Sequence, residues 1–191
     1  MDAEYFLRTA YGVRNEDLLR EVCAMATVTD VTKGTLLANC GEPQTQIFFL
    51  MKGIFRGFFL DIDGREITDC LAYRCGEVAM ASFGLNNPAQ VNIEMMTAGT
   101  VMGLPAAGLG ALMGKYPEVL VIYNQLLTKS LQMNWEMKIV LYQRTARERY
   151  EWFQENYPGL IDRISNKYVA SFLRMNPVTF SRLLHSGDRD A

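Results

Sequence analysis

The spacing of hydrophobic positions changes along the chain and predicts a strand-rich middle between helical ends. From Val28 onward, short apolar and β-branched runs alternate with glycines about a dozen residues apart. This spacing is typical of an all-β sandwich or barrel. Asp63-Gly64 lies between two such runs and predicts a hairpin turn, because both residues tolerate positive φ. The expected strands are Ile47–Met51, Ile54–Leu60, Glu66–Leu71 and Val91–Met95.

Two shorter patterns flank this region. Asn15 is expected to cap a helix that runs to about Ala26, with Leu18 and Val22 on its inner side. The uncharged run Met95–Gly114 has the nominal length of a membrane span. Glycines and Pro105 interrupt it, so it predicts a strand followed by a short helix that starts at Pro105.

After Pro117 the apolar positions have helical spacing to about Asn156. Within this stretch, positions seven apart and one intermediate position form a stripe that resembles a coiled-coil seam. A polar Asn134 on the seam would fix register and two-strandedness. The stripe predicts a parallel dimer helix or, alternatively, a helix buried against the protein's own β region. Its residues are Leu120, Leu127, Leu131, Asn134 and Leu141.

The segment Ile164–His185 predicts two short helices joined by a sharp turn. Ser165 is expected to cap the first helix through its hydroxyl, and Asn176-Pro177 to start the second. The outer face of the second helix is short and polar, which suits a helix inserted in a DNA major groove. The positions expected to face inward are Tyr168, Val169, Phe172, Leu173, Phe180, Leu183 and Leu184, and those expected to face outward are Val178, Ser181, Arg182 and His185.

The charge of the chain is unevenly distributed. The length of 191 residues allows one good-sized domain, or one with a small second domain. The chain is 49% hydrophobic and carries a net charge of −2. Residues 144–191 carry eight Lys and Arg against six Asp and Glu, and no acidic residue lies between Arg163 and Gly187. A basic window on an acidic protein is typical of a DNA-contacting module. An ordinary solvated surface would look similar.

The residue types argue against a metal site, a cofactor and an enzyme. The four cysteines form no Cys-x-x-Cys pair, and His185 is the single histidine. We therefore expect free buried thiols and no metal or cofactor. No nucleophile–base pair is evident, which indicates a protein that is not an enzyme. The acidic N-terminus does not resemble a signal peptide, so we expect a cytoplasmic protein without membrane association.

Val178-Thr179-Phe180-Ser181-Arg182 resembles the opening of the recognition helix in Crp/Fnr-type bacterial transcription regulators. The β region resembles the sensor domain of the same family, a jelly roll of the cyclic-nucleotide-binding type, and the resemblance covers nearly the whole chain. The matching sensor segments are Val31–Thr35, Gly41–Pro43, Phe48–Gly53, Asp61–Glu66, Gly76-Glu77 and Val101–Pro105.

The resemblance implies an α+β chain with three parts. Residues 1–114 would form the jelly-roll sensor domain, residues 115–156 the dimerisation helix and joint, and residues 157–191 the helix-turn-helix DNA-binding domain. The implied partners are a second copy of the chain and double-stranded DNA with an inverted-repeat operator.

The chain departs from the family where cyclic nucleotides bind. The family's Gly-Glu pair and its phosphate-binding Arg would fall near Met80-Ala81 and Ala89-Gln90, and Lys115 is the one cation between Gly76 and Val119. A buried phosphate needs a cation or several N–H donors. We therefore expect that cAMP and cGMP do not bind tightly, and that the cavity takes a less anionic effector or none. Polar residues near it, which simple loop polarity also explains, are Ser82, Asn86, Asn87, Gln90 and Asn92.

The resemblance also names the residues expected at DNA. Arg182 matches the family's recognition-helix Arg, which can bind guanine in a fork. Val178 replaces the familiar Glu and would pack against a thymine methyl, and Ser181 would read a base edge. Contacts with the DNA backbone are expected from Thr179, Asn176, Ser165, Asn166 and Lys167.

Arg174 stands where the family often has Gly, and a left-handed conformation there costs about 1 kcal/mol. It predicts a phosphate contact or a distorted turn. The sequence thus indicates a DNA-binding transcription regulator that responds to an unknown signal. The alternative is a jelly-roll module for a small molecule or a protein, with a degenerate helix-turn-helix that does not bind DNA.

Overall fold

The computed structural model of the chain describes residues 1–82, 84 and 87–186. Packing divides the chain into two units, one of residues 1–59 and 69–127 and the other of residues 60–68 and 128–191. The division falls inside a long helix and gives the tip of a hairpin to the second unit. The three-part boundaries expected from the sequence stay a prediction.

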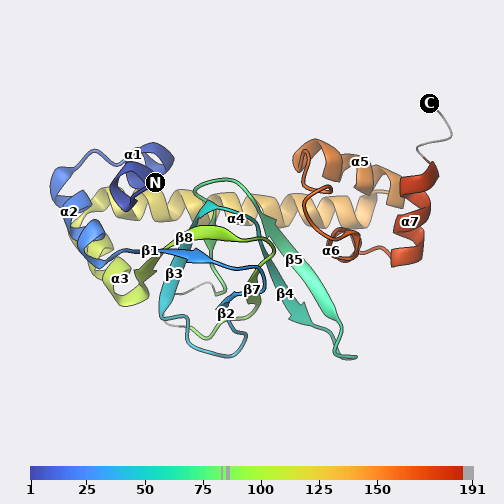
Figure 1. The fold of residues 1–191 in the computed structure, drawn as a ribbon, viewed down its shortest axis with the longest axis horizontal. Helices are drawn as coiled ribbons and strands as arrows, with labels where there is room; N and C mark the ends of the chain where they lie inside the picture. The colour runs from blue at the N-terminus through green and yellow to red at the C-terminus, as the bar shows by residue number, and fades with distance from the viewer. Residues whose placement is uncertain (83, 85–86, 187–191) are drawn as a thin grey trace. The chain divides into compact units, whose positions relative to one another are not determined.

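Figure 1 shows the elements in chain order. The chain begins with α1 (Ala3–Tyr11) and α2 (Glu16–Met25). The strands are β1 (Thr27–Val31), β2 (Leu36–Ala38), β3 (Gln46–Lys52), β4 (Phe55–Leu60), β5 (Glu66–Ala72), β6 (Val78–Ala79), β7 (Asn92–Met95) and β8 (Gly99–Pro105). The later helices are α3 (Ala106–Lys115), α4 (Pro117–Gln143), α5 (Ala146–Asn156), α6 (Asn166–Phe172) and α7 (Pro177–Ser186).

The strands form two sheets, in the orders β1-β8-β3-β6 and β2-β7-β4-β5. β8 pairs antiparallel with both β1 and β3, and β7 pairs antiparallel with both β2 and β4. Leu50, Phe55, Ile93, Met95 and Val101 belong to one buried cluster that draws on both sheets. The predicted α+β fold with an N-terminal jelly roll is confirmed.

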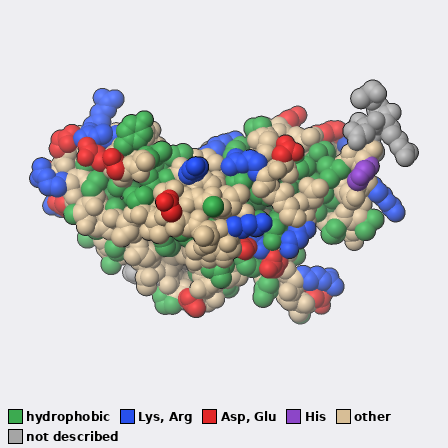
Figure 2. Space-filling model, viewed as in Figure 1, with side chains coloured by type: hydrophobic (Ala, Val, Ile, Leu, Met, Phe, Trp, Pro, Cys, Tyr) green, Lys and Arg blue, Asp and Glu red, His purple; other side chains and the backbone are tan. Residues whose placement is uncertain are grey.

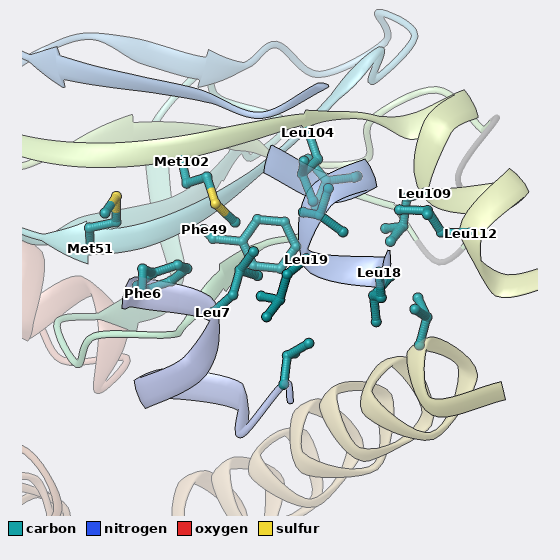
Figure 3. Packing of buried hydrophobic residues seen from close by; sticks show 14 of the residues in the cluster. Phe6, Leu7, Leu18, Leu19, Phe49, Met51, Met102, Leu104, Leu109 and Leu112 are labelled. Atoms are coloured by element: carbon teal, nitrogen blue, oxygen red, sulfur yellow. The ribbon is translucent and has the colours of Figure 1, made fainter. Parts of the chain in front are cut away.

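Alternation along β3 gives its sheet a second buried face. Ile47, Phe49 and Met51 pack with α1, α2 and α3, whereas Leu50 belongs to the cluster that draws on both sheets. Successive side chains of a strand point to opposite faces, which explains the unbroken apolar run. Figure 3 shows Phe6 and Leu7 of α1, Leu18 and Leu19 of α2, and Leu109 and Leu112 of α3 around Phe49.

The predicted strands and hairpin are confirmed. β3, β4, β5 and β7 match the expected ranges to within one residue at each end. In the hairpin turn, Asp61 Oδ1 accepts the backbone N–H groups of Asp63 and Arg65, both at 2.9 Å. Gly64 has φ 76°, a left-handed conformation that this type of turn requires and that Gly adopts without strain.

The flanking predictions are also confirmed. Asn15 caps α2, since its Oδ1 accepts the N–H groups of Asp17 at 3.1 Å and Leu18 at 3.2 Å. The uncharged run divides into β8 and α3, with Pro105 at the junction. Within the described ranges, no helix combines the length and the apolar character needed to cross a bilayer.

The helical stretch expected to about Asn156 does end there, but it is divided into two helices. α4 ends at Gln143, and Thr145 is extended (φ −64°, ψ 166°) and starts α5. Thr145 and Glu148 form a capping box, in which the Glu148 carboxylate accepts the Thr145 backbone N–H at 2.8 Å. This bond and a second one from the Thr145 hydroxyl lower the pKa of Glu148. Helical periodicity continues across the break, so it hid the Thr-x-x-Glu start signal.

The expectation of free thiols holds, but the expectation that they are buried is only partly met. All four cysteines are free. Cys23 and Cys70 are partly buried, and burial raises the pKa of Cys70 to about 12. Cys40 and Cys75 are exposed. Both stand in turn segments between strands, where a side chain can point to solvent.

Candidate nucleic-acid interface

α6 and α7 form the predicted pair of short helices on a buried apolar core. Val169, Phe172 and Leu173 of the first helix and its end are buried, as is Phe180 of the second. Tyr168, Leu183 and Leu184, also expected to face inward, are partly exposed.

Aromatic residues of α5 complete this core. Phe153 stacks on Tyr157 with ring centroids 5.1 Å apart, and Phe172 packs edge-on against Tyr157 at 5.5 Å. Tyr150 packs edge-on against Phe180 at 5.6 Å. The helix that precedes the predicted DNA-binding domain is therefore structurally part of it.

The turn after α6 is tight and regular. Arg174 has φ 53°, the left-handed conformation expected at this position. Its N–H donates to Ser171 O at 3.1 Å, and Met175 N–H donates to Ala170 O at 2.8 Å. These two bonds are the pair that defines a Schellman motif. Arg174 is thus accommodated at a cost without loss of the turn's hydrogen bonds.

The two expected caps differ. Ser165 occupies the N-cap position of α6, but the predicted hydrogen bond from a backbone N–H to its hydroxyl is not made. Asn176 Oδ1 accepts the Val178 N–H at 2.8 Å and caps α7. The Ser165 hydroxyl therefore makes no capping hydrogen bond, whereas the side-chain oxygen of Asn176 does.

The residues predicted to contact DNA all lie at the surface of this module. Val178 is an apolar side chain that is 58% exposed. Ser181 and Arg182 follow on the same helical face, three and four residues later. The other exposed members of the set are Ser165, Asn166, Lys167, Asn176 and Thr179. Their contact with DNA stays a prediction.

His185 extends this face by one turn and was not assigned a contact from the sequence. Its Nδ1 lies 2.6 Å from the Ser181 carbonyl oxygen, so the ring is held with Nε2 turned away from that carbonyl. Lys and Arg side chains are interspersed with Asp and Glu over the molecular face in Figure 2. Charge alone therefore does not mark the interface, in keeping with the weak basic window of the sequence.

Sequence reasoning missed two residues that hold α6 in place. Arg149 Nη1 of α5 donates to the Leu173 carbonyl oxygen at 2.9 Å. Ser171 Oγ accepts the Thr68 N–H of the hairpin tip at 2.9 Å and donates to Glu66 O at 3.3 Å. Both depend on tertiary packing, since Thr68 and Ser171 are 103 residues apart. No pattern in the sequence links them.

In the sensor unit, hydrogen bonds within the protein occupy the donors expected to face a cyclic nucleotide. The Ala81 N–H donates to Gln44 Oε1 at 3.0 Å, and the Gln90 N–H donates to Ala81 O at 2.7 Å. Ala89 is buried, and its N–H donates to Glu42 O at 2.9 Å. The two segments thus bond to each other, where a bound phosphate would need their free N–H groups.

Two of the polar side chains proposed for the effector are hydrogen-bonded to backbone groups of the protein. Ser82 Oγ donates to Gly84 O at 2.7 Å, and Asn92 Oδ1 accepts the Cys40 N–H at 3.0 Å. Asn87 and Gln90 are exposed. Asn86 lies outside the described residues. Loop polarity, the simpler of the two explanations, accounts for the bonds that Ser82 and Asn92 make.

Cations in and beside this region are paired. Lys115 bonds to the Glu21 carboxylate, and this bond is the main cause of a lowered pKa at Glu21. Arg56 of β4 is 1% exposed and was not noticed in the sequence. Its Nε and Nη2 donate to Glu94 Oε2 at 2.9 and 2.8 Å. The Arg56 charge is therefore balanced within the sheet.

The expected dimer stripe on α4 occupies a mixture of environments. Leu131 is 60% exposed, and Leu120 and Asn134 are also exposed, whereas Leu127 and Leu141 are partly buried. Trp135, Ile139 and Tyr142 are exposed and continue from Leu131 at helical spacing. In the C-terminal half of α4, the uncovered apolar stripe is therefore shifted by about one residue from the predicted seam.

Comparison with known proteins bears on the fold. No protein-family model matches the sequence, and no curated protein sequence matches it either. Among solved structures, FixK2 from Bradyrhizobium japonicum is similar with a TM-score of 0.77, at 19% identity over 86% of this chain and 85% of that one. The regulator CLP of Xanthomonas campestris is similar with a TM-score of 0.75, at 15% identity over 92% of this chain and 93% of that one.

A third similar structure carries the family's name. It is a protein from Eubacterium rectale assigned to the Crp/Fnr family of transcriptional regulators, with a TM-score of 0.72 at 17% identity over 95% of this chain and 87% of that one. Each of these likenesses covers at least 86% of the chain. The chain therefore has the fold of the Crp/Fnr-type transcription regulators.

Proposed function

We propose that the chain is a dimeric, cytoplasmic, DNA-binding transcription regulator that responds to a signal other than cAMP or cGMP. The observation that carries the proposal is the face of α7 formed by Val178, Ser181 and Arg182. These side chains are exposed on a helix that follows a tight turn and packs through its inner face on a buried aromatic core. A helix presented in this way can enter a major groove and read base edges.

The dimer is supported by the exposed apolar stripe of α4. Leu131, Trp135 and Ile139 are each close to half exposed or more, which is costly on a helix that stays in water. A second copy that covers the stripe would place two recognition helices for an inverted repeat.

Two observations support a signal other than cAMP or cGMP. The backbone N–H groups of Ala81 and Gln90 already bond within the protein. Lys115 and Arg56 are already paired with carboxylates. CLP, which has a similar fold, is c-di-GMP-responsive, so a signal other than cAMP has a precedent on this fold. A regulator of this kind acts by shifting the population between two arrangements of its recognition helices.

Substitution of Arg182 tests the DNA-binding function. Wild-type protein would be used to enrich duplexes from fragments of its own genome at two salt concentrations. Arg182→Ala is expected to lose about 1–3 kcal/mol of discrimination between the enriched duplex and a scrambled one, because a fork on guanine is lost. Arg163→Ala removes the same charge from an exposed position outside α7 and is the matched control.

The same experiment distinguishes the alternative function. Equal loss of discrimination in both variants, or none in either, would contradict a base contact by Arg182. Absence of any enriched duplex, with and without extracts that supply effectors, would favour the non-DNA-binding jelly-roll module.

A further inference from the structure

One guanidinium group joins α5 to the turn of the helix-turn-helix. Arg149 is partly buried, and its Nη1 donates to the Leu173 carbonyl oxygen at 2.9 Å. Leu173 is the C-cap residue of α6, so this carbonyl is among those that lack an intrahelical partner. A cationic donor is electrostatically favoured at this end of a helix.

The bond falls at the most constrained point of the module. Arg174, in the left-handed conformation, is the next residue, and α7 begins three residues later at Pro177. The Schellman bonds tie the turn to α6, because they run from Arg174 and Met175 back to Ser171 and Ala170. The Arg149 bond ties the turn to a different helix, α5.

The guanidinium at this position has two opposing effects on stability. The Arg149 Nε is buried and makes no hydrogen bond to the residues that the structure describes. A buried donor without a partner destabilises the folded state. A methionine of similar length would remove that penalty, although it would also leave the Leu173 carbonyl uncapped. The two effects oppose each other.

We propose that Arg149 is a positioning residue that fixes the turn and, through it, the orientation in which α7 reads DNA. The inference rests on the proposed DNA-binding function. Base contacts need the helix at a defined depth and angle, whereas phosphate contacts carry no sequence information. Release of the turn should therefore reduce selectivity more than general affinity for DNA.

The test compares Arg149→Met with Arg147→Met. Arg147 lies on the same helix, but it is exposed and pairs with Glu151 at 3.1 Å. The probes are a duplex enriched with wild-type protein from a random-sequence library and a scrambled duplex, each titrated over a salt series. Arg149→Met is expected to bind the enriched duplex about tenfold more weakly, as for one lost charge-assisted hydrogen bond. Its binding to the scrambled duplex and its salt slope should stay at the control's values.

Two results would overturn the inference. Equal weakening on both duplexes with a shallower salt slope would make Arg149 a phosphate contact. Selectivity equal to that of Arg147→Met would show that the bond does not position α7. Arg149→Lys keeps a cationic donor and is expected to retain most of the selectivity. If the methionine variant does not fold, Arg149→Gln takes its place.

Amide hydrogen exchange separates this inference from the proposed function. If the wild-type protein enriches no duplex, the proposed function fails. The role of Arg149 is then decided by exchange at the Arg174 and Met175 amides. Faster exchange at both in Arg149→Met, but not in Arg147→Met, would support the positioning role, and equal exchange in the two variants would contradict it.

Discussion

At the scale of single residues, the helix-turn-helix carries a conformational cost that its fold tolerates. Arg174 adopts φ 53° because the Schellman motif requires a left-handed residue between α6 and α7. A side chain with a Cβ atom is disfavoured there by roughly 1 kcal/mol. The sequence indicated this cost, and the intact turn bonds show that it did not distort the turn.

Arg174→Gly is therefore expected to raise the free energy of unfolding by about 1 kcal/mol. Urea unfolding monitored by circular dichroism would measure the change. Lys167→Gly, within α6, is the matched control and should lower the free energy of unfolding by about 1 kcal/mol, because Gly disfavours helix. A loss of stability in Arg174→Gly would mean that contacts of the Arg174 side chain outweigh its backbone strain.

At the scale of elements, the break between α4 and α5 changes which apolar residues can belong to the predicted dimer seam. The Thr145–Glu148 capping box ends the continuous helix, so the apolar positions beyond it belong to the helix-turn-helix core. In the C-terminal half of α4, the exposed large apolar side chains are Leu131, Trp135, Ile139 and Tyr142. Lys138 Nζ lies 5.3 Å from the Trp135 ring centroid, which partly shields that ring.

Trp135→Glu is expected to dissociate the dimer, because it would place a charge within an apolar interface. The dimer dissociation constant should rise by at least about tenfold, as for a loss of 1.4 kcal/mol or more. Ser130→Glu adds the same charge on another face of α4 and should leave the constant unchanged. Sedimentation over a concentration series would measure both, and a dimer equally stable in the two variants would exclude this stripe as the seam.

At the scale of the whole molecule, hydrogen bonds within the sensor unit join the segments near Ala81 and Gln90, where the family resemblance places a cyclic nucleotide. Gln44 is buried and bonds on both sides of the segment, donating to Ala79 O at 2.8 Å and accepting from the Ala81 N–H. The Ala81 N–H is therefore already bonded within the protein and is not free to donate to a ligand phosphate.

Millimolar cAMP or cGMP is therefore expected to leave the thermal unfolding midpoint unchanged, because a ligand that does not bind the native state adds no stability. Differential scanning fluorimetry would measure this, with the enriched duplex as the positive control. A midpoint that rises and saturates with nucleotide concentration would show that the bonds from Gln44 and Gln90 open to admit a ligand.

The sequence by itself determined the order and type of most elements. Short apolar runs between regularly spaced glycines predicted four strands, Asp63-Gly64 predicted the hairpin turn, and Asn176-Pro177 predicted the start of α7. These features depend on local φ preferences and on side-chain periodicity, which a short stretch of sequence carries. The left-handed conformation of Arg174 was expected from the family resemblance, because the family often has Gly at this turn.

Only the tertiary structure decided which polar groups are already occupied. The bonds from Arg149 to Leu173, from Gln44 to Ala81 and from Arg56 to Glu94 join residues 24, 37 and 38 positions apart. Such pairs depend on how elements pack, and a residue's own neighbours in the chain do not specify a partner so far away. The side chains left exposed on α7 and α4 follow from that packing.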